Sequence, residues 1–474
     1  MYQWGMTSLL PLGLDRSTKT SLTEQIYVGI GAAIGSGVLS PGARLPSWRD
    51  LAAQLGVARG TVRAAYERLQ DAQLIVSSRS AGTRVANRPQ TVAAAPKVAE
   101  PHDALPEAYR DVSPGPGIFQ MGSPALDVFP ATLFARIRTR TVRAETVGPS
   151  SYPDPRGETQ LRREVAAHLA ISRSIECLPS QVIITAGYTG ALGLALHVLR
   201  LAGRSAWVED PGFPLARRAL QIAQMETIPV PVDDEGMDVA CGLRHAPGAA
   251  LAVVTPGQQA PLGPTMSLVR RLSLLDWATQ TGAWIIEDDY LGELQLRGRA
   301  APALASLDRT GRVIHIGSFS KTLSPTLRLG FVVVPPALAP LFEEAATCLA
   351  PAPGAAVQQA TAEFMHEGHY LRHLRRMKRV YAVRRDALKT CLEPLGLPAH
   401  LAGLAMLLKL PMEVSDTQIA REAAAFGLAP SPLSIWYSDP ERRQSGLLLG
   451  VTTAPGNRLA ASCDRLQQLI EKFS

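Results

Sequence analysis

Apolar residues near the start of the chain follow the spacing of two short helices. In the segment LAAQLGVARGTVRAAYERL they recur at intervals of three and four residues, which places them on one face of each helix. These residues are Leu51, Ala52, Leu55, Val62, Tyr66 and Leu69. Gly56 separates the two groups, and glycine often ends helices because it enters the left-handed conformation at little cost. The pattern predicts a helix-turn-helix, with Val57 filling the turn.

Polar residues around this helix pair stand where a DNA-binding helix-turn-helix needs them. The start of the second helix carries two arginines and a threonine, and this end of the helix meets base edges in the major groove. Ser47 can cap the first helix, and Arg49 can reach a phosphate. Residues 74–85, with Gly82 at a turn, predict a β-hairpin wing. The candidate DNA-contacting residues are Arg44, Ser47, Arg49, Arg59, Thr61, Arg63, Arg79 and Arg84.

From about residue 118 onward, short apolar runs alternate with helical patterns such as that of residues 268–281. The runs predicted as strands are 182–184, 206–208, 249–254, 284–286, 313–316 and 331–334. Short apolar strands joined by helices predict an α/β fold with a mostly parallel or mixed sheet covered on both faces. Ligands of such sheets bind beyond the carboxyl ends of the strands, so we look for the chemistry there.

Residues 87–117 are rich in proline and alanine and show no sustained apolar period. Frequent proline favours extended, solvated backbone, so this stretch is expected to be a semi-rigid linker. The sequence therefore predicts a DNA-binding domain at 15–86, a linker at 87–117 and a large domain at 118–474.

Charge and composition narrow the function. The net charge is +7, and residues 1–95 carry ten Lys and Arg against five Asp and Glu. This local excess suggests a polyanionic partner such as double-stranded DNA, although a solvated basic surface would give the same balance. No apolar run approaches the length of about 20 residues that a membrane helix needs, so no membrane partner is expected. Five scattered cysteines without a Cys-x-x-Cys pair suit a cytoplasmic protein and argue against disulfides and a zinc site, so no metal is expected.

The segment GSFSKTLSPTLRLG, residues 317–330, contains a lysine directly after a predicted strand. Lys321 follows a Ser-x-Ser and precedes Arg328, so an amine stands near three groups that can donate to a phosphate. A lysine in this setting suits a Schiff base to a phosphorylated aldehyde. A lone lysine after a strand is more often a surface residue, so the interpretation depends on the rest of the site.

Three further strand ends carry residues that suit the same cofactor. In IIEDDY the carboxylate of Asp288 can keep a pyridine nitrogen protonated, and Tyr290 can bond a ring hydroxyl, although such acidic pairs are often solvated. In TAGYTG, residues 185–190, a strand leads into a helix whose amino end favours phosphate. Phe213, in EDPGFP, could stack on a flat ring.

Residues 21–85 resemble the winged helix of the GntR family in the order and spacing of SLTEQIYVGI, the helix-turn-helix and AGTRV. The resemblance implies DNA binding. Gly60 departs from the family, which usually has a polar or larger residue there, so that position offers no base contact.

From about Phe119 to the C-terminus, the chain resembles the fold-type I aminotransferases, including SYPDPRG at 151–157. The resemblance implies that Lys321 forms the Schiff base with pyridoxal 5'-phosphate (PLP), that Asp288 faces the pyridine nitrogen and that Tyr290 contacts the ring oxygen. It also implies that Phe213 stacks on the ring and that Tyr152 reaches across from a partner subunit. The residues expected around the phosphate are Gly187, Tyr188, Thr189, Ser318, Ser320 and Arg328.

A GntR winged helix, a proline-rich linker and an aminotransferase-like domain in one chain resemble the MocR family of bacterial regulators. The resemblance implies a PLP-dependent transcription regulator that binds promoter DNA as a head-to-tail homodimer, with RNA polymerase as a further candidate partner. Its effector would be PLP itself or an amino compound such as GABA, taurine or D-alanine. Such a protein is not an enzyme, although residual or half-reaction transaminase activity is compatible with it. The alternatives are a genuine aminotransferase with a vestigial DNA-binding arm, and a DNA-binding protein whose large domain is only a scaffold.

Two features of the large domain leave alternatives open. Aminotransferases place an arginine shortly before the strand that corresponds to residues 447–450 to bind a substrate carboxylate, and here Arg442 and Arg443 are the nearest candidates. The segment YLRHLRRMKRVYAVRR, residues 370–385, predicts a strongly basic helix. This helix is either a solvated or dimer-pairing face or a second contact with the DNA backbone.

Overall fold

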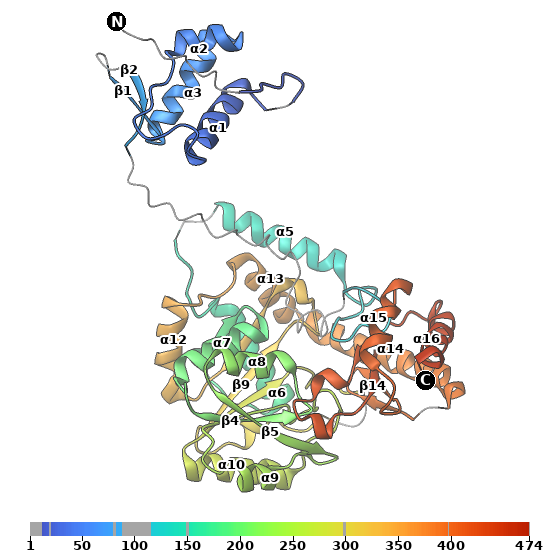
Figure 1. The fold of residues 1–474 in the computed structure, drawn as a ribbon. Coiled ribbons are helices and arrows are strands. Elements are labelled where there is room, and N and C mark those ends of the chain that lie inside the picture. Colours follow the sequence, from blue (N-terminus) through green and yellow to red (C-terminus); the bar gives the residue numbers. More distant parts are fainter. Residues whose placement is uncertain are drawn as a thin grey trace, which may run out of the picture. The chain divides into compact units, whose positions relative to one another are not determined.

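The computed structural model describes residues 12–18, 20–78, 82–87, 115–147, 151–296, 300–396 and 398–473. The chain divides into two compact units, one within residues 1–102 and one within residues 103–474 (Figure 1). Arg79 and residues 88–114 of the predicted linker lie outside the described residues.

The first unit is a three-helix core with a hairpin. It comprises α1 (Leu22–Gly35), α2 (Trp48–Leu55), α3 (Arg59–Asp71), β1 (Ile75–Ser78) and β2 (Gly82–Val85). The two strands pair antiparallel, as predicted for the wing. The predicted apolar stripes are confirmed, because their residues are buried or partly buried in one cluster with α1. The residues of this unit that are almost fully buried include Ile26, Ile30, Leu51, Val62 and Leu69.

The turn between α2 and α3 depends on a glycine and on a serine cap. Gly56 ends α2 with φ 60° and ψ 37°, in the left-handed region where a side chain is strained. Ser47 begins α2 by accepting a hydrogen bond from the backbone N–H of Asp50 at 3.2 Å. Gly60 lies inside α3 with nothing within 4 Å of the place where a Cβ would stand. The backbone conformation at position 56 therefore favours glycine. Position 60, only four residues later, has a helical conformation and room for a side chain.

We expect Gly56→Ala and Gly60→Ala to change the stability of the first unit in opposite directions. A left-handed alanine costs about 1–2 kcal/mol, so Gly56→Ala should destabilise the helix pair. Alanine in a helix is better than glycine by about 0.5 kcal/mol, so Gly60→Ala should stabilise it. Hydrogen exchange of peptides from residues 51–71 in the full-length protein measures both effects. Equal protection in the two variants would show that the turn does not need its left-handed residue.

The core of the second unit is an eight-stranded mixed sheet with the order β3-β10-β9-β8-β7-β4-β5-β6. Its strands are β3 (Val182–Thr185), β4 (Ser205–Asp210), β5 (Glu226–Asp233), β6 (Gly236–Met237), β7 (Leu251–Val254), β8 (Trp284–Asp289), β9 (Val313–Ser318) and β10 (Gly330–Val333). The five central strands run parallel, and β10 is antiparallel to both of its neighbours. The sequence predicted all of these strands except β5 and the edge strand β6.

Helices cover both faces of this sheet. Side chains alternate along the strands, so that Ile286 packs with α7, α8 and α12 while Ile285 packs with α9 and α10 on the other face. The helices α5, α6, α13 and α14 enclose another core with β3 and β10. The bounds are α5 (Ala131–Val147), α6 (Thr159–Arg173), α7 (Gly187–Leu199), α8 (Pro214–Ile222), α9 (Val239–His245), α10 (Leu268–Thr281), α11 (Leu304–Leu307), α12 (Ala339–Cys348), α13 (Ala355–His366) and α14 (His369–Leu392).

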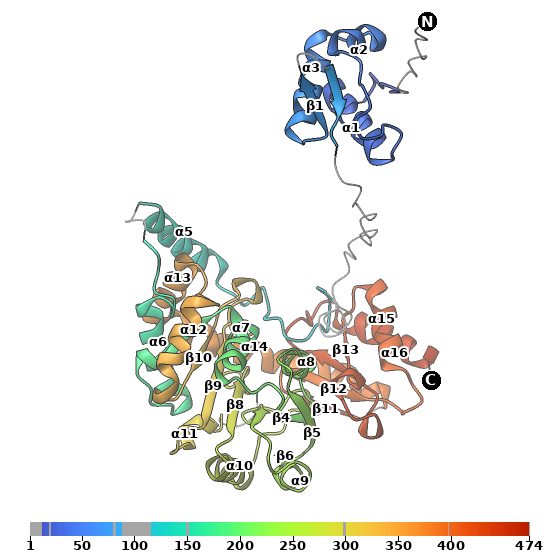
Figure 2. The same cartoon turned by 60° about the vertical axis from the view of Figure 1, so that its left-hand side comes forward.

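A smaller lobe completes the second unit beyond α14 (Figure 2). Its four-stranded antiparallel sheet has the order β11-β12-β14-β13 and is packed on one face by α14, α15 and α16. The elements are β11 (Ala399–Ala402), β12 (Ala405–Lys409), α15 (Asp416–Ala423), β13 (Ser431–Pro432), β14 (Gly446–Gly450) and α16 (Leu459–Phe473). Among the described helices of the whole chain, none is long and apolar enough to cross a membrane.

Candidate DNA-binding and cofactor sites

The first unit exposes most of the predicted DNA-contacting residues. Arg59 and Arg63 are exposed in the first turns of α3, and Thr61 is partly exposed between them. Arg63 also forms an ion pair with Glu67 at 2.8 Å, one turn along the same helix. Arg49 is exposed at the start of α2, with its guanidinium 4.8 Å from the ring centre of Trp48.

The wing brings two more of the predicted arginines together. Arg44 and Arg84 form an isolated antiparallel bridge between their backbones, although 40 residues separate them in the chain. Both side chains are exposed, and Arg84 also donates to the carbonyl oxygen of Gly42 at 2.9 Å. The wing and the start of α3 therefore each present cations, which is the charge distribution that a phosphate backbone requires.

In the second unit, the ends of several strands bring Lys321 and Asp288 together. Asp288 is the next-to-last residue of β8, and Lys321 follows the neighbouring strand β9 by three residues. The Lys321 ammonium donates to the carbonyl oxygen of Gly122 at 2.7 Å. A Cβ at Gly122 would lie 2.6 Å from this nitrogen, and Gly122 has φ 76°, so a side chain there would displace the lysine end and strain the backbone. The sequence offered no signal for Gly122, because it precedes the lysine by 199 residues.

Burial shifts the pKa values of Lys321 and Asp288 in opposite directions. Burial lowers the pKa of Lys321, while the nearby charge of Asp288 opposes that change. Burial, together with the carboxylates of Asp289 and Glu209, holds the pKa of Asp288 well above its ordinary value. Among the described residues, none donates a hydrogen bond to the Asp288 side chain. The carboxylate of Asp288 can therefore accept a hydrogen bond from a protonated group of a ligand. A pyridinium nitrogen is such a group.

The predicted phosphate site lies where α7 begins. The residue before α7, Ala186, gives no side-chain cap, so the N–H groups of the first turn face outward without one. Arg328 reaches this turn and donates to the hydroxyl of Thr189 at 2.9 Å and to the carbonyl oxygen of Ala186 at 3.2 Å. Ser320 donates its backbone N–H to the Ser318 hydroxyl at 3.2 Å in the adjacent loop. Two of the predicted anion-binding segments thus meet through Arg328.

The loop that carries Phe213 is fixed between the large sheet and the small lobe. The Phe213 ring lies 6.0 Å from the ring of Tyr188 and 5.9 Å from that of Trp436. Asp210 accepts hydrogen bonds from the backbone N–H and the hydroxyl of Ser438 at 2.6 and 2.9 Å. Gly212 donates to the carbonyl oxygen of Trp436 at 3.0 Å. These bonds hold the aromatic side chain at the ends of the strands.

Glu209 is a buried acid that is not among the site residues predicted from the sequence. It accepts hydrogen bonds from the backbone N–H and the hydroxyl of Thr255 at 3.0 and 2.5 Å, and from the amide of Gln259 at 3.3 Å. Burial raises the pKa of Glu209 to about 7, although these bonds oppose the shift. The sequence shows that Glu209 lies near the end of a predicted strand. It does not show that Glu209 is buried, because the loop that covers it, with Thr255 and Gln259, is more than 40 residues away.

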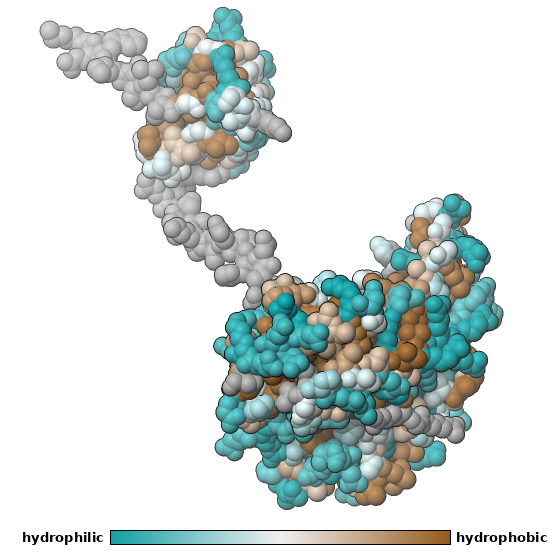
Figure 3. Space-filling model, turned by 90° about the vertical axis from the view of Figure 1, so that its right-hand side faces the viewer, coloured by the Kyte–Doolittle hydropathy of each residue, from teal (hydrophilic) through white to brown (hydrophobic). Residues whose placement is uncertain are grey.

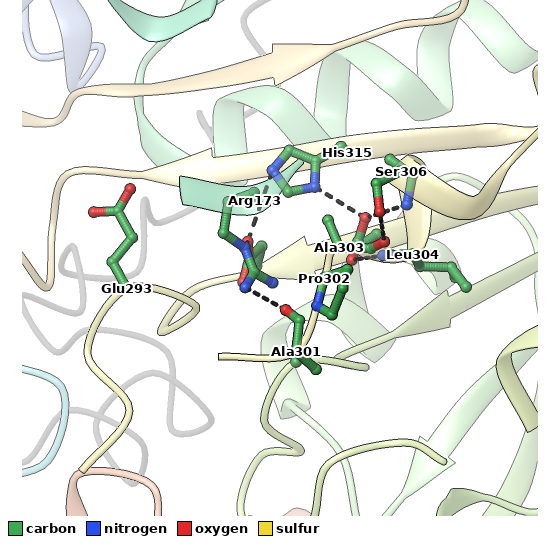
Figure 4. A network of polar contacts seen from close by, with 12 residues as sticks. Arg173, Glu293, Ala301, Pro302, Ala303, Leu304, Ser306 and His315 are labelled. Carbon is green, nitrogen blue, oxygen red and sulfur yellow. Dashed lines mark hydrogen bonds and ion pairs between the residues drawn. The ribbon is translucent and has the colours of Figure 1, made fainter. Parts of the chain in front are cut away.

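Asp289 belongs to a buried polar network behind the site rather than to a solvated turn. Arg173 donates to Asp289 at 2.6 Å and to the carbonyl oxygen of Ala301 at 2.7 Å. His315 lies 3.9 Å from the carboxylate of Asp289 through one ring nitrogen and contacts Glu287 at 3.0 Å through the other (Figure 4). Burial raises the pKa of Glu287, but His315 outweighs this and holds it below the ordinary value. The network anchors the residues on either side of Asp288 in the strand.

The remaining predicted residues are not brought to this site within one chain. Tyr152 is fully exposed, with a relative exposure of 101%. Arg442 is exposed and pairs with Asp439 at 3.3 Å, and Arg443 is exposed beside it. Neither arginine makes a hydrogen bond or ion pair to a predicted cofactor-binding residue among the described residues.

The predicted basic helix is confirmed as part of α14. Its inner face carries Tyr370, Met377 and Tyr381, which are buried. Its outer face exposes a row of cations that have no ion pair among the described residues, namely Arg375, Arg376, Lys378 and Arg379. A groove with a volume of about 590 Å³ runs beside Arg376 and Arg379 to the start of α16. This surface is compatible with both interpretations of the helix.

The two units define a class of protein in which a DNA-binding winged helix is joined to an aminotransferase fold. The sequence pattern of "Bacterial regulatory proteins, gntR family" matches residues 22–85, and that of "Aminotransferase class I and II" matches residues 119–426. The second unit is similar to kynurenine aminotransferase of Pyrococcus horikoshii, with a TM-score of 0.69 and 25% identity over 78% of this chain and 95% of that one. It is also similar to LysN of Thermus thermophilus, with a TM-score of 0.70 and 25% identity over 78% and 95% of the two chains.

Relatives with both units are regulators. The chain is 34% identical to the "Probable rhizopine catabolism regulatory protein MocR" of Rhizobium meliloti over 93% of this chain and 92% of that one. It is 33% identical to the pyridoxine biosynthesis regulator PdxR of Corynebacterium glutamicum over 82% of each chain. It is 32% identical to TauR of Rhodobacter capsulatus over 90% and 91% of the two chains. The chain belongs to the MocR family. These relatives favour a transcription regulator with an aminotransferase-like domain over a genuine aminotransferase.

The residues of the second unit fit PLP. A half-buried amine, a buried acid without a hydrogen-bond donor and an uncapped helix start with an arginine stand beside one another. The hydroxyl of Tyr188, next to Phe213, is also buried and has no partner among the described residues. Asp288, the Tyr188 hydroxyl and the first N–H groups of α7 lack partners that the cofactor could supply, and the Lys321 amine has the carbonyl oxygen of Gly122 as its hydrogen-bond acceptor.

Proposed function

We propose that this regulator binds promoter DNA through the first unit and senses PLP or an amino compound through the second. The observation that carries the proposal is the proximity of the Lys321 amine, which is half-buried, to Asp288, a buried acid that receives no hydrogen bond among the described residues. A buried charge without a partner is costly, and such pairs are therefore typical of ligand sites. Two similar structures support this, since they are complexes with PMP and with a phosphopyridoxyl amino acid.

In this proposal each part of the site has one task. Lys321 would hold the aldehyde carbon of PLP, and Asp288 would keep its ring nitrogen protonated. Arg328 and the first turn of α7, with Ser318 and Ser320, would bind the phosphate. Tyr290 would contact the ring oxygen and Phe213 would stack on the ring. When bound, the cofactor supplies an electron sink for amines.

The burial of Lys321 has a consequence for amine exchange. Burial lowers the pKa of Lys321, so the lysine more readily reaches its neutral form. Only the neutral amine nitrogen can bond to an aldehyde carbon. The pKa of Asp288 is raised in the structure as described, and a pyridinium cation would reverse that shift by pairing with the carboxylate. The site is therefore complementary to a cation at the end of β8.

We also propose a homodimer. Tyr152 is fully exposed, and the exposed apolar side chains nearby in the sequence include Val142 and Val147. On the face of the second unit drawn in Figure 3, hydrophobic residues gather beside polar ones. Apolar surface of this kind is often covered by a partner subunit. A partner copy would then place its Tyr152 near this chain's cofactor, as the resemblance to aminotransferases implies. The head-to-tail arrangement, RNA polymerase as a partner and a cytoplasmic location stay predictions.

Footprinting of the protein's own upstream DNA tests the proposal. We expect the protected half-sites or their affinity to change when PLP, or PLP with an amino compound, is added to the full-length protein. A ligand shifts DNA binding only by its unequal affinity for two states of the protein. Identical footprints and affinities under all conditions would contradict ligand sensing and would favour the scaffold alternative. Sustained turnover of an amino donor with a keto acid would favour the aminotransferase alternative.

A further inference from the structure

The groove between α14 and the start of α16 has an apolar floor and cations along it, and we call it the α14 groove. Its floor is made of small and apolar residues from α14, from α16 and from the segment before α16, namely Val380, Val383, Ala387, Ala454, Gly456 and Leu459. Arg376, Arg379 and Arg384 line the same groove. Val383 is apolar, yet 70% of its surface is exposed. Exposed apolar surface bordered by charged residues is typical of a site where another segment docks.

The cations of α14 lack negative partners at this groove. Arg376 and Arg379 have no ion pair among the described residues, and the same holds for Arg375 and Lys378 beside them. Arg375 and Arg379 are four residues apart on the helix, and Arg376 and Arg379 are three apart. Like charges at these spacings repel one another and destabilise a helix. Carboxylates placed in the groove would therefore be stabilising.

The apolar floor favours a peptide over a DNA backbone as the occupant. Phosphates would satisfy the arginines, but they would leave Val383 and Leu459 without apolar contacts. Large apolar side chains of a peptide would cover these residues, and burial of apolar surface is favourable in proportion to its area. The groove is therefore complementary to a segment that carries both carboxylates and large apolar side chains.

The chain itself contains a segment with this chemistry, at the end of the predicted linker. Residues 103–114 read DALPEAYRDVSP and lie outside the described residues. Three acids stand four residues apart in this segment, against a single arginine, and they are Asp103, Glu107 and Asp111. Large apolar residues stand between and beside the acids, namely Leu105, Tyr109 and Val112. We call residues 103–114 the acidic linker segment.

The described chain leads from the α14 groove to the end of the acidic linker segment. Asp127 pairs with Arg384 of the groove at 2.5 Å. The carbonyl oxygen of Gln120 accepts from the hydroxyl of Thr453 at 3.0 Å, and Thr453 directly precedes Ala454 of the floor. Gly115 is five residues before Gln120, so it lies within about 18 Å of that residue. The acidic linker segment can extend over about 40 Å, so the groove is within its reach.

We propose that the acidic linker segment docks in the α14 groove. Its apolar side chains would cover the floor, and its carboxylates would pair with Arg376, Arg379 and the cations beside them. The tether of the DNA-binding unit would then shorten from the whole predicted linker to residues 87–102. This inference is independent of the proposed cofactor site, because the residues of that site are not among those that line the groove.

The test is hydrogen exchange of the full-length protein, followed in peptides that contain residues 103–114. We expect these amides to exchange at least about fivefold more slowly than in a free synthetic peptide of the same sequence. Arg376→Glu combined with Arg379→Glu replaces attraction by repulsion at the groove and should remove this protection. Glu107→Lys combined with Asp111→Lys should remove it from the side of the segment. The protein with all four substitutions exchanges the charges and should recover at least about half of the protection.

Arg136→Glu combined with Arg143→Glu is the matched control. Both arginines are exposed on α5, so this variant has the same change in net charge at another surface and should keep the protection of residues 103–114. Peptides from β12 and β14 show in the same experiment whether the small lobe stays folded. The substitutions of Glu107 and Asp111 change no described residue, so they test the docking even if the groove variant does not fold.

Two results would overturn the inference. The first is exchange of residues 103–114 that is as fast in the wild-type protein as in the free peptide, or protection that survives both pairs of charge reversals. The second is a groove variant that loses DNA affinity and salt dependence while residues 103–114 keep their slow exchange. That result would assign the cations of α14 to the DNA backbone.

Discussion

Lys321→Ala is expected to abolish stable binding of PLP and the visible absorbance that accompanies it. The amine of Lys321 is half-buried near the ends of β8 and β9, and Gly122 provides its hydrogen-bond acceptor. Alanine cannot form a covalent bond with the aldehyde, and in the proposed site the remaining residues would hold only the phosphate and the ring. Borohydride reduction followed by peptide mapping measures the covalent attachment directly.

Lys389→Ala is the matched control for this substitution. Lys389 is exposed near the end of α14, so its loss should leave the absorbance band and the labelled peptide in place. A Lys321→Ala protein that remains yellow and can still be reduced onto a peptide would show that another amine holds the cofactor. In that case the assignment of the site would be wrong.

Arg59→Ala and Arg63→Ala should each weaken DNA binding, with the larger effect at the residue that contacts a base. Both arginines are exposed in the first turns of α3, where a recognition helix enters the major groove. An arginine that contacts a base is worth about 1–3 kcal/mol of binding free energy, and its loss relaxes sequence preference. An arginine that contacts only a phosphate mainly lowers the salt dependence of binding. Titrations of specific and scrambled DNA at several salt concentrations distinguish the two.

Gln70→Ala serves as the control on the same helix. Gln70 is exposed at the other end of α3, so its loss should change neither affinity nor salt dependence. If the two arginine variants behaved like Gln70→Ala, α3 would not be the recognition helix. The ion pair of Arg63 with Glu67 would then be only a surface contact, which contributes little to stability.

Local patterns were sufficient for the elements that a few neighbouring residues define. The stripes of α2 and α3, the glycine at the turn and the span of α10 are visible in the sequence and agree with the structure. The antiparallel sheet of the small lobe was largely missed, since β13 has two residues and too short a pattern to read. Pairing with β14, not its own sequence, makes it a strand.

The candidate site shows the same division between local and distant causes. Lys321 and Asp288 could be proposed because each follows an apolar run that predicts a strand. Asp289 next to it looked like a solvated acid, and it is buried because Arg173, 116 residues earlier, reaches it. The partner of Lys321 was equally invisible, because folding alone brings Gly122 to it. Contacts between distant segments determine charge states that the sequence cannot show.

The bonds between the Phe213 loop and the small lobe have a consequence for timing. Asp210 and Gly212 hold Ser438 and Trp436 through several hydrogen bonds at once, so separating the loop from the lobe breaks them together. Openings that break many bonds at once are rarer and slower than the motion of a free loop. A ligand enclosed there would leave slowly after its concentration outside has fallen. The protein would then stay in its ligand-bound state for some time after the ligand becomes scarce. The genes it controls would respond to depletion with a delay.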